Sequence, residues 1–122
     1  MNPGANKRNG MGFETDLLAY LRANDWPAEQ LHLRGAKDEG DLIVRLGPYH
    51  MVIEAKAEKE FGLSGYMSEL EAEVANYAQA RNLEDYLVRG MAVVKRPRRG
   101  IGSAYVVRTL ARELQIWNET FG

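Results

Sequence analysis

The sequence predicts an α/β protein in which a mixed central β-sheet is flanked by helices. Two patterns favour this class: segments with helical spacing of apolar residues alternate with short β-like segments, and the resulting order is α-β-β-β-α-β-β-α. The length agrees, because 122 residues suit one domain with a modest core. We expect residues 1–11 to form a flexible N-terminal arm and residues 12–122 to form that single domain.

The first half of the chain is expected to form a helix and three strands. Their ranges are about 12–24, 30–34, 42–46 and 51–55. The segment Asp25-Trp26-Pro27 ends the helix, because proline cannot continue it. Gly47-Pro48-Tyr49-His50 is typical of a hairpin turn between the second and third strands.

The second half is expected to form a long helix, two strands and a C-terminal helix. Their ranges are about 66–82, 91–95, 104–107 and 109–118. The two strands are joined by the basic loop Arg96-Pro97-Arg98-Arg99-Gly100-Ile101-Gly102. A helix between strands allows parallel pairing, which is why we expect the sheet to be mixed.

Composition excludes several classes of protein. The chain has no cysteine, so disulfides, thiolate nucleophiles and cysteine zinc sites are excluded. No apolar run reaches the ~20 residues of a membrane helix, and the N-terminus lacks the apolar stretch of a secretory signal. Gly10-Met11-Gly12 and Gly100-Ile101-Gly102 lack the other residues of nucleotide-binding motifs. We expect a cytoplasmic protein with no membrane association and no nucleotide cofactor.

Charge is unevenly distributed, although the formal net charge is only −1. Residues 89–112 contain seven basic side chains and no acidic one, whereas residues 54–85 are strongly acidic. This separation indicates an anionic partner held near clustered carboxylates, or alternatively an ordinary solvated surface.

Alternation along the hairpin places three charged residues on one face of the sheet. The apolar residues of the two strands occupy the other face: Leu42, Val44, Leu46, Met51, Ile53 and Ala55. If Gly47 pairs with His50, Asp41 lies opposite Lys56 and diagonal to Glu54. Two carboxylates beside a lysine can bind Mg²⁺, although a surface salt bridge would use the same residues.

The spacing of these residues resembles the PD-(D/E)XK nuclease signature. Gly40-Asp41 precedes the strand pair, and Glu54-Ala55-Lys56 supplies the Glu-x-Lys tripeptide. From Phe13 to the C-terminal helix, the chain is similar to the archaeal and phage-type Holliday-junction resolvases of that superfamily. Gly40 stands where the motif has proline.

The resemblance implies a restriction-endonuclease-like core and a role for each matching residue. Asp41, Glu54 and the Ala55 carbonyl would bind Mg²⁺, with Mn²⁺ as a substitute, and Lys56 would be the catalytic lysine. Glu14 matches the glutamate of the first helix that completes the site, although an acidic residue in a first helical turn also stabilises the helix without any such role. The implied activity is paired cleavage of four-way DNA junctions during recombination by a homodimer, in a bacterial or phage-infected cell.

Basic residues form the expected DNA-binding surface. They are Lys7, Arg8, Arg34, Lys37, Lys95, Arg96, Arg98 and Arg99. Lysine and arginine neutralise phosphates without reading bases. Two alternatives stay open: another PD-(D/E)XK DNase, VRR-type or restriction-like, that cuts flap, linear or single-stranded DNA, and a non-catalytic DNA-binding module.

Overall fold

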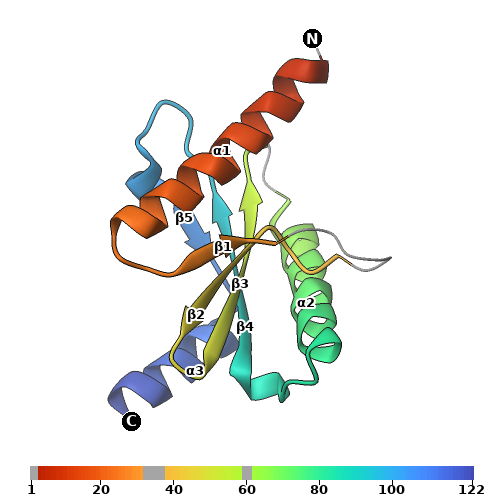
Figure 1. Cartoon of the computed structure of the whole chain (residues 1–122), viewed down its shortest axis with the longest axis vertical. Helices are drawn as coiled ribbons and strands as arrows, with labels where there is room; N and C mark the ends of the chain where they lie inside the picture. The colour runs from red at the N-terminus through yellow and green to blue at the C-terminus, as the bar shows by residue number, and fades with distance from the viewer. Residues whose placement is uncertain (1–2, 32–37, 59–61) are drawn as a thin grey trace.

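The helices and strands follow one another in the order that the sequence predicts (Figure 1). The computed structural model describes residues 3–31, 38–58 and 62–122. Within these ranges the elements are α1 (Pro3–Ala23), β1 (Ala28–Gln30), β2 (Leu42–Leu46), β3 (Tyr49–Lys56), α2 (Leu63–Ala80), η1 (Asp85–Leu87), β4 (Val88–Val94), η2 (Ile101–Ser103), β5 (Tyr105–Val107) and α3 (Leu110–Phe121). The predicted fold class, a mixed sheet flanked by helices, is confirmed.

The strands form one sheet in the order β1-β2-β3-β4-β5. Only β3 and β4 are parallel among the described neighbours, and the other pairs are antiparallel. A parallel pair requires a crossover connection, which α2 supplies along one face of the sheet (Figure 1). The carboxyl ends of β3 and β4 therefore meet at the same end of the sheet, where Lys56 pairs with Val94.

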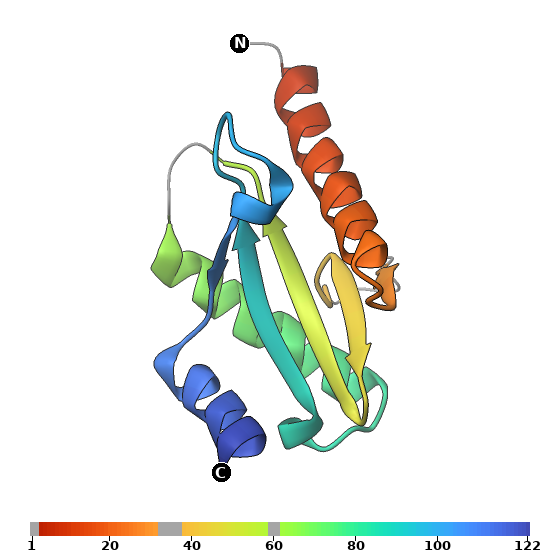
Figure 2. The same ribbon diagram turned by 90° about the vertical axis from the view of Figure 1, so that its left-hand side faces the viewer.

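The two faces of the sheet pack against different helices (Figure 2). Phe13 and Leu17 of α1 are buried against one face, together with the predicted apolar set of the hairpin. The opposite face packs against Leu70, Val74 and Tyr77 of α2. This alternation confirms that the predicted apolar set of the hairpin faces α1 and that Glu54 and Lys56 lie on the other face.

The hairpin register differs from the prediction by two residues. Leu46 pairs with Tyr49, so the two-residue turn is Gly47-Pro48, and not Pro48-Tyr49. Gly47 has a φ of +64° and the following proline fixes φ near −65°, the combination that a type II′ turn requires. A shift by two preserves the faces, but it places Asp41 opposite Glu54 and not opposite Lys56.

The largest of the other boundary differences from the prediction are in α1 and β1. α1 begins at Pro3, because a helix propagates beyond the residues whose apolar side chains reveal it. β1 is Ala28–Gln30, which pairs with residues 42–44 of β2, whereas the expected strand was 30–34. Residues 32–34 lie outside the described ranges, and the arm at 1–11 and the single domain at 12–122 stay predictions. No helix in the described residues is long and apolar enough to cross a membrane.

Candidate active site

Asp41 is held at the start of β2 by two backbone contacts from β3. Its amide N–H donates to the Ile53 carbonyl at 3.0 Å, and its Oδ2 accepts from the Ala55 N–H at 2.8 Å. One end of the hairpin therefore fixes both the position and the orientation of this carboxylate.

Glu54 and Lys56 lie on the face of β3 that α2 covers. Lys56 Nζ is 3.5 Å from Glu54 Oε1 and 2.9 Å from Glu69 Oε2, and it lies 5.0 Å above the Tyr66 ring. Burial alone would lower the pKa of Lys56, but the hydrogen bond that it donates to Glu69 and the charge of Glu54 raise it above its ordinary value. The lysine is therefore cationic when it lies between the two glutamates.

Buried carboxylate oxygens without donors are the main electrostatic feature of this site. Glu54 is 6% exposed and Glu73 of α2 is 2% exposed. No hydrogen-bond donor in the described part of the chain reaches Glu54 Oε2 or either oxygen of Glu73. Two carboxylates cannot donate to each other, so the facing pair needs a shared proton or a cation.

The pKa values of these groups reflect the crowding. Burial, the facing Glu73 carboxyl and the charge of Asp41 raise the pKa of Glu54 to about 10. Burial and the charges of Asp38 and Glu69 raise the pKa of Glu73 to about 7. The pKa of Asp41 is also raised, first by burial and then by the charges of Glu14 and Asp38. A divalent cation at this position would stabilise the ionised form of every one of these carboxylates.

The residues present fit a hard divalent cation. Asp41 directly precedes β2, where the strand pairing continued by one residue places it opposite Glu54, and Glu54 Oε2 has no donor in the described residues. Magnesium and manganese prefer such oxygen ligands and retain several waters. The proposed backbone ligand, the Ala55 carbonyl, lies between Glu54 and Lys56 on the same strand, and its role stays a prediction.

Glu14 lies on the opposite side of the sheet from α2. It projects from α1 and accepts a hydrogen bond from Gln30 Nε2 at 3.0 Å. Its charge contributes to the raised pKa of Asp41, which places the two carboxylates in electrostatic reach of each other. Whether Glu14 completes the site, as the resemblance implies, stays a prediction.

The sequence interpretation missed three carboxylates that lie beside Asp41 and Glu54. One oxygen from each of Asp38, Glu69 and Glu73 lies within 4.8 Å of the others, a spacing that suits a divalent metal ion. The sequence did carry a signal for Glu73, because it falls on the buried stripe of α2 between Leu70 and Tyr77. A glutamate at an apolar position of an amphipathic helix indicates a buried charge with a specific role.

Gly40 departs from the proline of the motif for a steric reason. Its φ of +101° is outside the range that proline can adopt. A Cβ at this position would lie 2.7 Å from Val52 Cγ1 and 3.1 Å from Glu73 Oε2. Glycine therefore lets the backbone before Asp41 pass close to β3 and α2.

The basic loop begins beside Lys56. The Lys95 N–H donates to the Lys56 carbonyl at 2.8 Å, because β3 and β4 end together. Arg98 and Arg99 are exposed, and the Arg96 guanidinium lies 4.8 Å from the centre of the Tyr105 ring. The loop and the carboxylates therefore share one end of the sheet. Arg34 and Lys37 lie outside the described residues, and so do the side chains of Lys7 and Arg8.

Comparison with known proteins supports the fold. No protein-family model matches the chain, and no curated protein matches it. Among solved structures, the chain is similar to Hjc from Archaeoglobus fulgidus, described as a Holliday junction resolvase from an archaeal hyperthermophile. The two chains are 20% identical, with a TM-score of 0.51, and the similarity covers 86% of this chain and 93% of that one. The chain thus has the fold of this resolvase, as its resemblance to PD-(D/E)XK nucleases implies.

Proposed function

We propose that the protein is a metal-dependent, structure-specific DNA endonuclease that resolves four-way junctions by paired phosphodiester hydrolysis. The observation that carries this proposal is the convergence of Asp41, Glu54 and Lys56 at one end of the sheet, where Glu54 Oε2 lacks any donor in the described residues. The fold shared with a Holliday junction resolvase supports the same substrate class. Such DNA occurs during recombination in the cytoplasm of bacterial or phage-infected cells.

The proposed cofactor is Mg²⁺, for which Mn²⁺ can substitute. Asp41, Glu54 and the Ala55 carbonyl would hold it, and Glu14 would complete the site by metal or water contact. A bound divalent cation supplies Lewis acidity at a phosphate oxygen and lowers the pKa of a coordinated water. The donor set fits this role, because all the ligands are oxygens.

The remaining chemistry belongs to residues of the chain itself. Lys56 is held in its cationic form near Glu54, where it can donate to a non-bridging oxygen of the scissile phosphate or orient the attacking water. The Ala55 N–H keeps Asp41 in a fixed orientation throughout. Arg98 and Arg99, at the same end of the sheet, would contact neighbouring phosphates.

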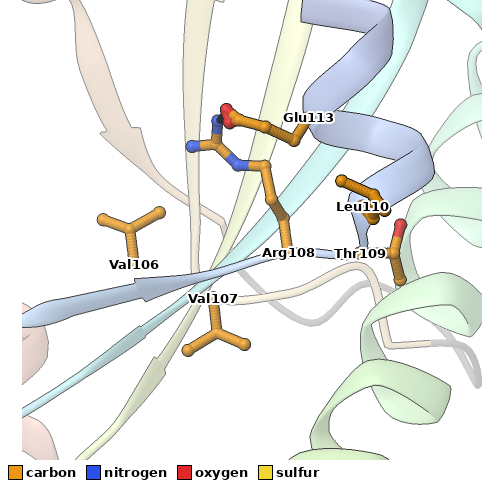
Figure 3. A pocket seen from close by; sticks show the side chains of 6 residues that line it. All are labelled: Val106, Val107, Arg108, Thr109, Leu110 and Glu113. Carbon is orange, nitrogen blue, oxygen red and sulfur yellow. Dashed lines mark hydrogen bonds and ion pairs between the residues drawn. The ribbon is translucent and has the colours of Figure 1, made fainter.

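A homodimer is proposed because α3 and β5 form an exposed apolar surface. Leu110, Trp117 and Phe121 of α3 are 70%, 50% and 82% exposed, and with Leu114 they follow helical spacing along one side. A pocket of about 550 Å³ lies where β5 leads into this helix, and Figure 3 shows the side chains that line it. β5 is the last strand of the sheet, so an antiparallel copy related by two-fold symmetry can extend the sheet and cover the apolar side chains.

The proposal is tested by cleavage of matched four-way junction, flap, single-stranded and linear DNA. Asp41→Asn, Glu54→Gln and Lys56→Ala should each reduce the cleavage rate by about 10²–10⁴-fold, the range for loss of one group that acts in the transition state. Asp16→Asn, an exposed change on α1, is the control and should cleave normally. Junction binding by the three variants should be largely retained.

The substrate comparison separates the proposal from its alternatives. A dimer that holds two arms at once should prefer a junction to linear duplex by at least ~10² and cut symmetrically on strands of like polarity. Equal cleavage of linear or single-stranded DNA would favour another DNase of the same fold. Tight binding with no cleavage in Mg²⁺ or Mn²⁺ would favour a DNA-binding module.

A further inference from the structure

A second cluster of carboxylates lies between the loop before Asp41 and helix α2. Glu69 and Glu73 are four residues apart on α2, so they project from the same side of the helix. Their oxygens and one oxygen of Asp38 lie within 4.8 Å of one another. Asp38 and Glu69 are exposed and Glu73 is buried, so the cluster opens to solvent on one side. None of the three belongs to the Asp-Glu-x-Lys motif.

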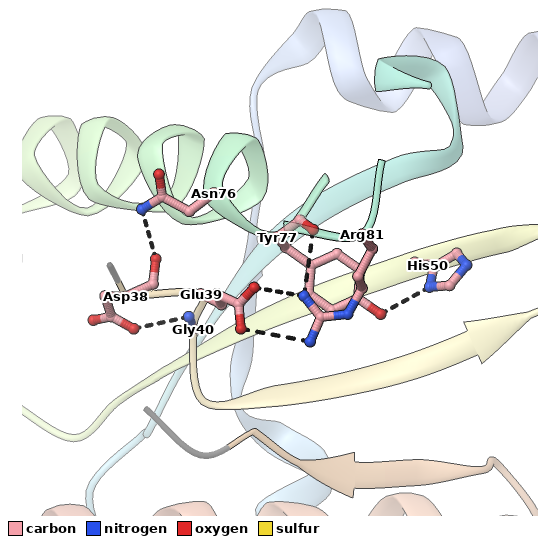
Figure 4. Close-up of polar contacts among 7 residues, drawn as sticks. All are labelled: Asp38, Glu39, Gly40, His50, Asn76, Tyr77 and Arg81. Atoms are coloured by element: carbon pink, nitrogen blue, oxygen red, sulfur yellow. Dashed lines mark hydrogen bonds and ion pairs between the residues drawn. The ribbon is translucent and has the colours of Figure 1, made fainter. Parts of the chain in front are cut away.

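The loop that carries Asp38 is attached to α2 by several contacts (Figure 4). Asn76 Nδ2 donates to the Asp38 carbonyl at 2.8 Å, and Arg81 forms an ion pair with Glu39. The Gly40 N–H donates to Asp38 Oδ1 at 2.9 Å, which fixes the direction of the carboxylate. The geometry of the cluster is therefore built by the fold and does not depend on long flexible side chains alone.

Buried carboxylate oxygens at this cluster lack a hydrogen-bond donor among the described residues. Glu73 contributes an oxygen to the cluster, and neither of its oxygens has a donor in the described ranges. Glu54, outside the cluster, faces Glu73 from β3, and its Oε2 also has no donor. Lys56 does not fill this role, because its ion pairs are with Glu69 and with the other oxygen of Glu54. Buried carboxylates are ordinarily paired or bind a metal.

We propose that Asp38, Glu69 and Glu73 form a second cation site, which takes a hard divalent cation such as Mg²⁺ or Mn²⁺ in addition to the one assigned to Asp41 and Glu54. The ligands are all carboxylate oxygens, and the open side leaves room for the waters that these ions retain. The inference goes beyond the proposed function, because binding here requires no DNA and no cleavage. The bound cation would join the Asp38 loop to α2 and so position Asp41, three residues further along the chain.

The test is to count the Mn²⁺ ions bound per chain, without DNA, from the electron paramagnetic resonance of free Mn²⁺, with a calorimetric Mg²⁺ titration alongside. The wild-type chain should bind two ions. Glu73→Gln should lose one of them and keep the one that Asp41→Asn removes. Glu71→Gln is the matched control on the same helix, where it breaks only an exposed ion pair with Arg112, and it should still bind two.

A second variant keeps the test decisive if Glu73→Gln fails to fold. Asp38→Asn combined with Glu69→Gln alters only exposed ligands and should also lose one ion. Two ions bound to both of these variants would overturn the assignment of the site. One ion in the wild type, lost in Asp41→Asn but kept when the cluster is altered, would refute the second site and leave the proposed nuclease site intact. A single ion lost in either case would show one shared site, and so would also refute the proposal.

Discussion

The helices α2 and α3 distribute charged and apolar side chains in opposite ways. α2 places Glu73 in the interior beside the buried Glu54, with no donor in the described residues for its carboxylate oxygens. α3 buries none of its side chains and leaves Trp117 and Phe121 largely exposed. One helix therefore covers charge inside the protein, and the other presents apolar surface to water.

Among the described residues, neither region has a partner of matching chemistry. An unpaired buried charge costs several kcal/mol, and a cation removes that cost. A contiguous exposed apolar face marks a contact surface, and another apolar surface covers it. Because the two requirements differ, metal ions and pH should act on the α2 region, whereas protein concentration should act on the α3 region.

The largest effect is expected when the apolar surface of α3 is removed. Leu114→Ser combined with Trp117→Ser should raise the dissociation constant of the dimer by at least ~100-fold. Burial of one large apolar side chain contributes about 1.5–3 kcal/mol, and a 100-fold change corresponds to about 2.8 kcal/mol. Sedimentation velocity over a range of protein concentrations measures this change. The number of bound Mn²⁺ ions should stay the same, since the change is confined to α3.

Trp26→Ser provides the control for that experiment. Trp26 is 51% exposed, but it lies in the turn between α1 and β1, away from β5 and α3. This variant should dimerise like the wild type. A wild-type protein that sediments as a monomer at tens of micromolar would contradict the role given to α3.

A smaller effect is expected from pH on the metal-free protein. The pKa values of Glu54 and Glu73 are raised in the folded state, whereas in the unfolded chain they are near 4.5. The stability that these groups contribute is therefore present below pH 4.5 and is lost as pH rises through about 7 and toward 10. In chelator, the free energy of unfolding in urea should be lower at pH 8 than at pH 5.5, and Mg²⁺ should restore it at pH 8.

Two variants separate this pH effect from the rest of the molecule. Glu73→Gln should weaken the fall in stability between pH 5.5 and pH 8, because the glutamine cannot ionise. The α3 double variant, measured at equal oligomeric state, should keep the wild-type dependence. A wild-type protein that gains stability as pH rises would show that these carboxylates are paired with cationic groups.

The order of elements and the faces of the hairpin were predictable because they depend on local periodicity. Leu42 and Ile53 face α1, whereas their neighbours Ile43 and Val52 face α2, whatever the conformation of the turn. The face on which Glu54 lies was therefore predictable from alternation alone. The register was wrong by two residues, because it depends on which pair forms the turn centre. The positive φ at Gly47 selects Gly47-Pro48, a preference that the Gly-Pro dipeptide itself indicates.

The motif residues of the site were predictable, but the α2 carboxylates were not. Asp41 directly precedes β2, and Glu54 and Lys56 lie on the adjacent strand β3, so the pairing of the hairpin brings the three together. Glu69 and Glu73 reach the site only through the packing of α2 on β3 and β4, which spacing along the chain does not specify. The position of Asp38 depends on a long-range contact with Asn76 and on the local conformation of its loop at Gly40. Neither follows from the periodicity of the sequence.

The smallest effect is expected at the basic loop, where the charges of Arg98 and Arg99 are exposed and neither buried nor part of an apolar face. Arg98→Ala combined with Arg99→Ala should leave both stability and dimerisation unchanged. The slope of the logarithm of the DNA-binding constant against log[salt] should fall by roughly 1.8 for duplex DNA, because each phosphate contact contributes roughly 0.9. Arg96 is left in place because it stacks on Tyr105 of β5, so its removal would also disturb the proposed dimer surface. Arg45→Ala, exposed on β2, serves as the control for a change in net charge alone. Equal slopes for the wild type and the loop variant would show that the loop does not contact DNA, in which case the α2 region would have to bind its substrate without this neighbour.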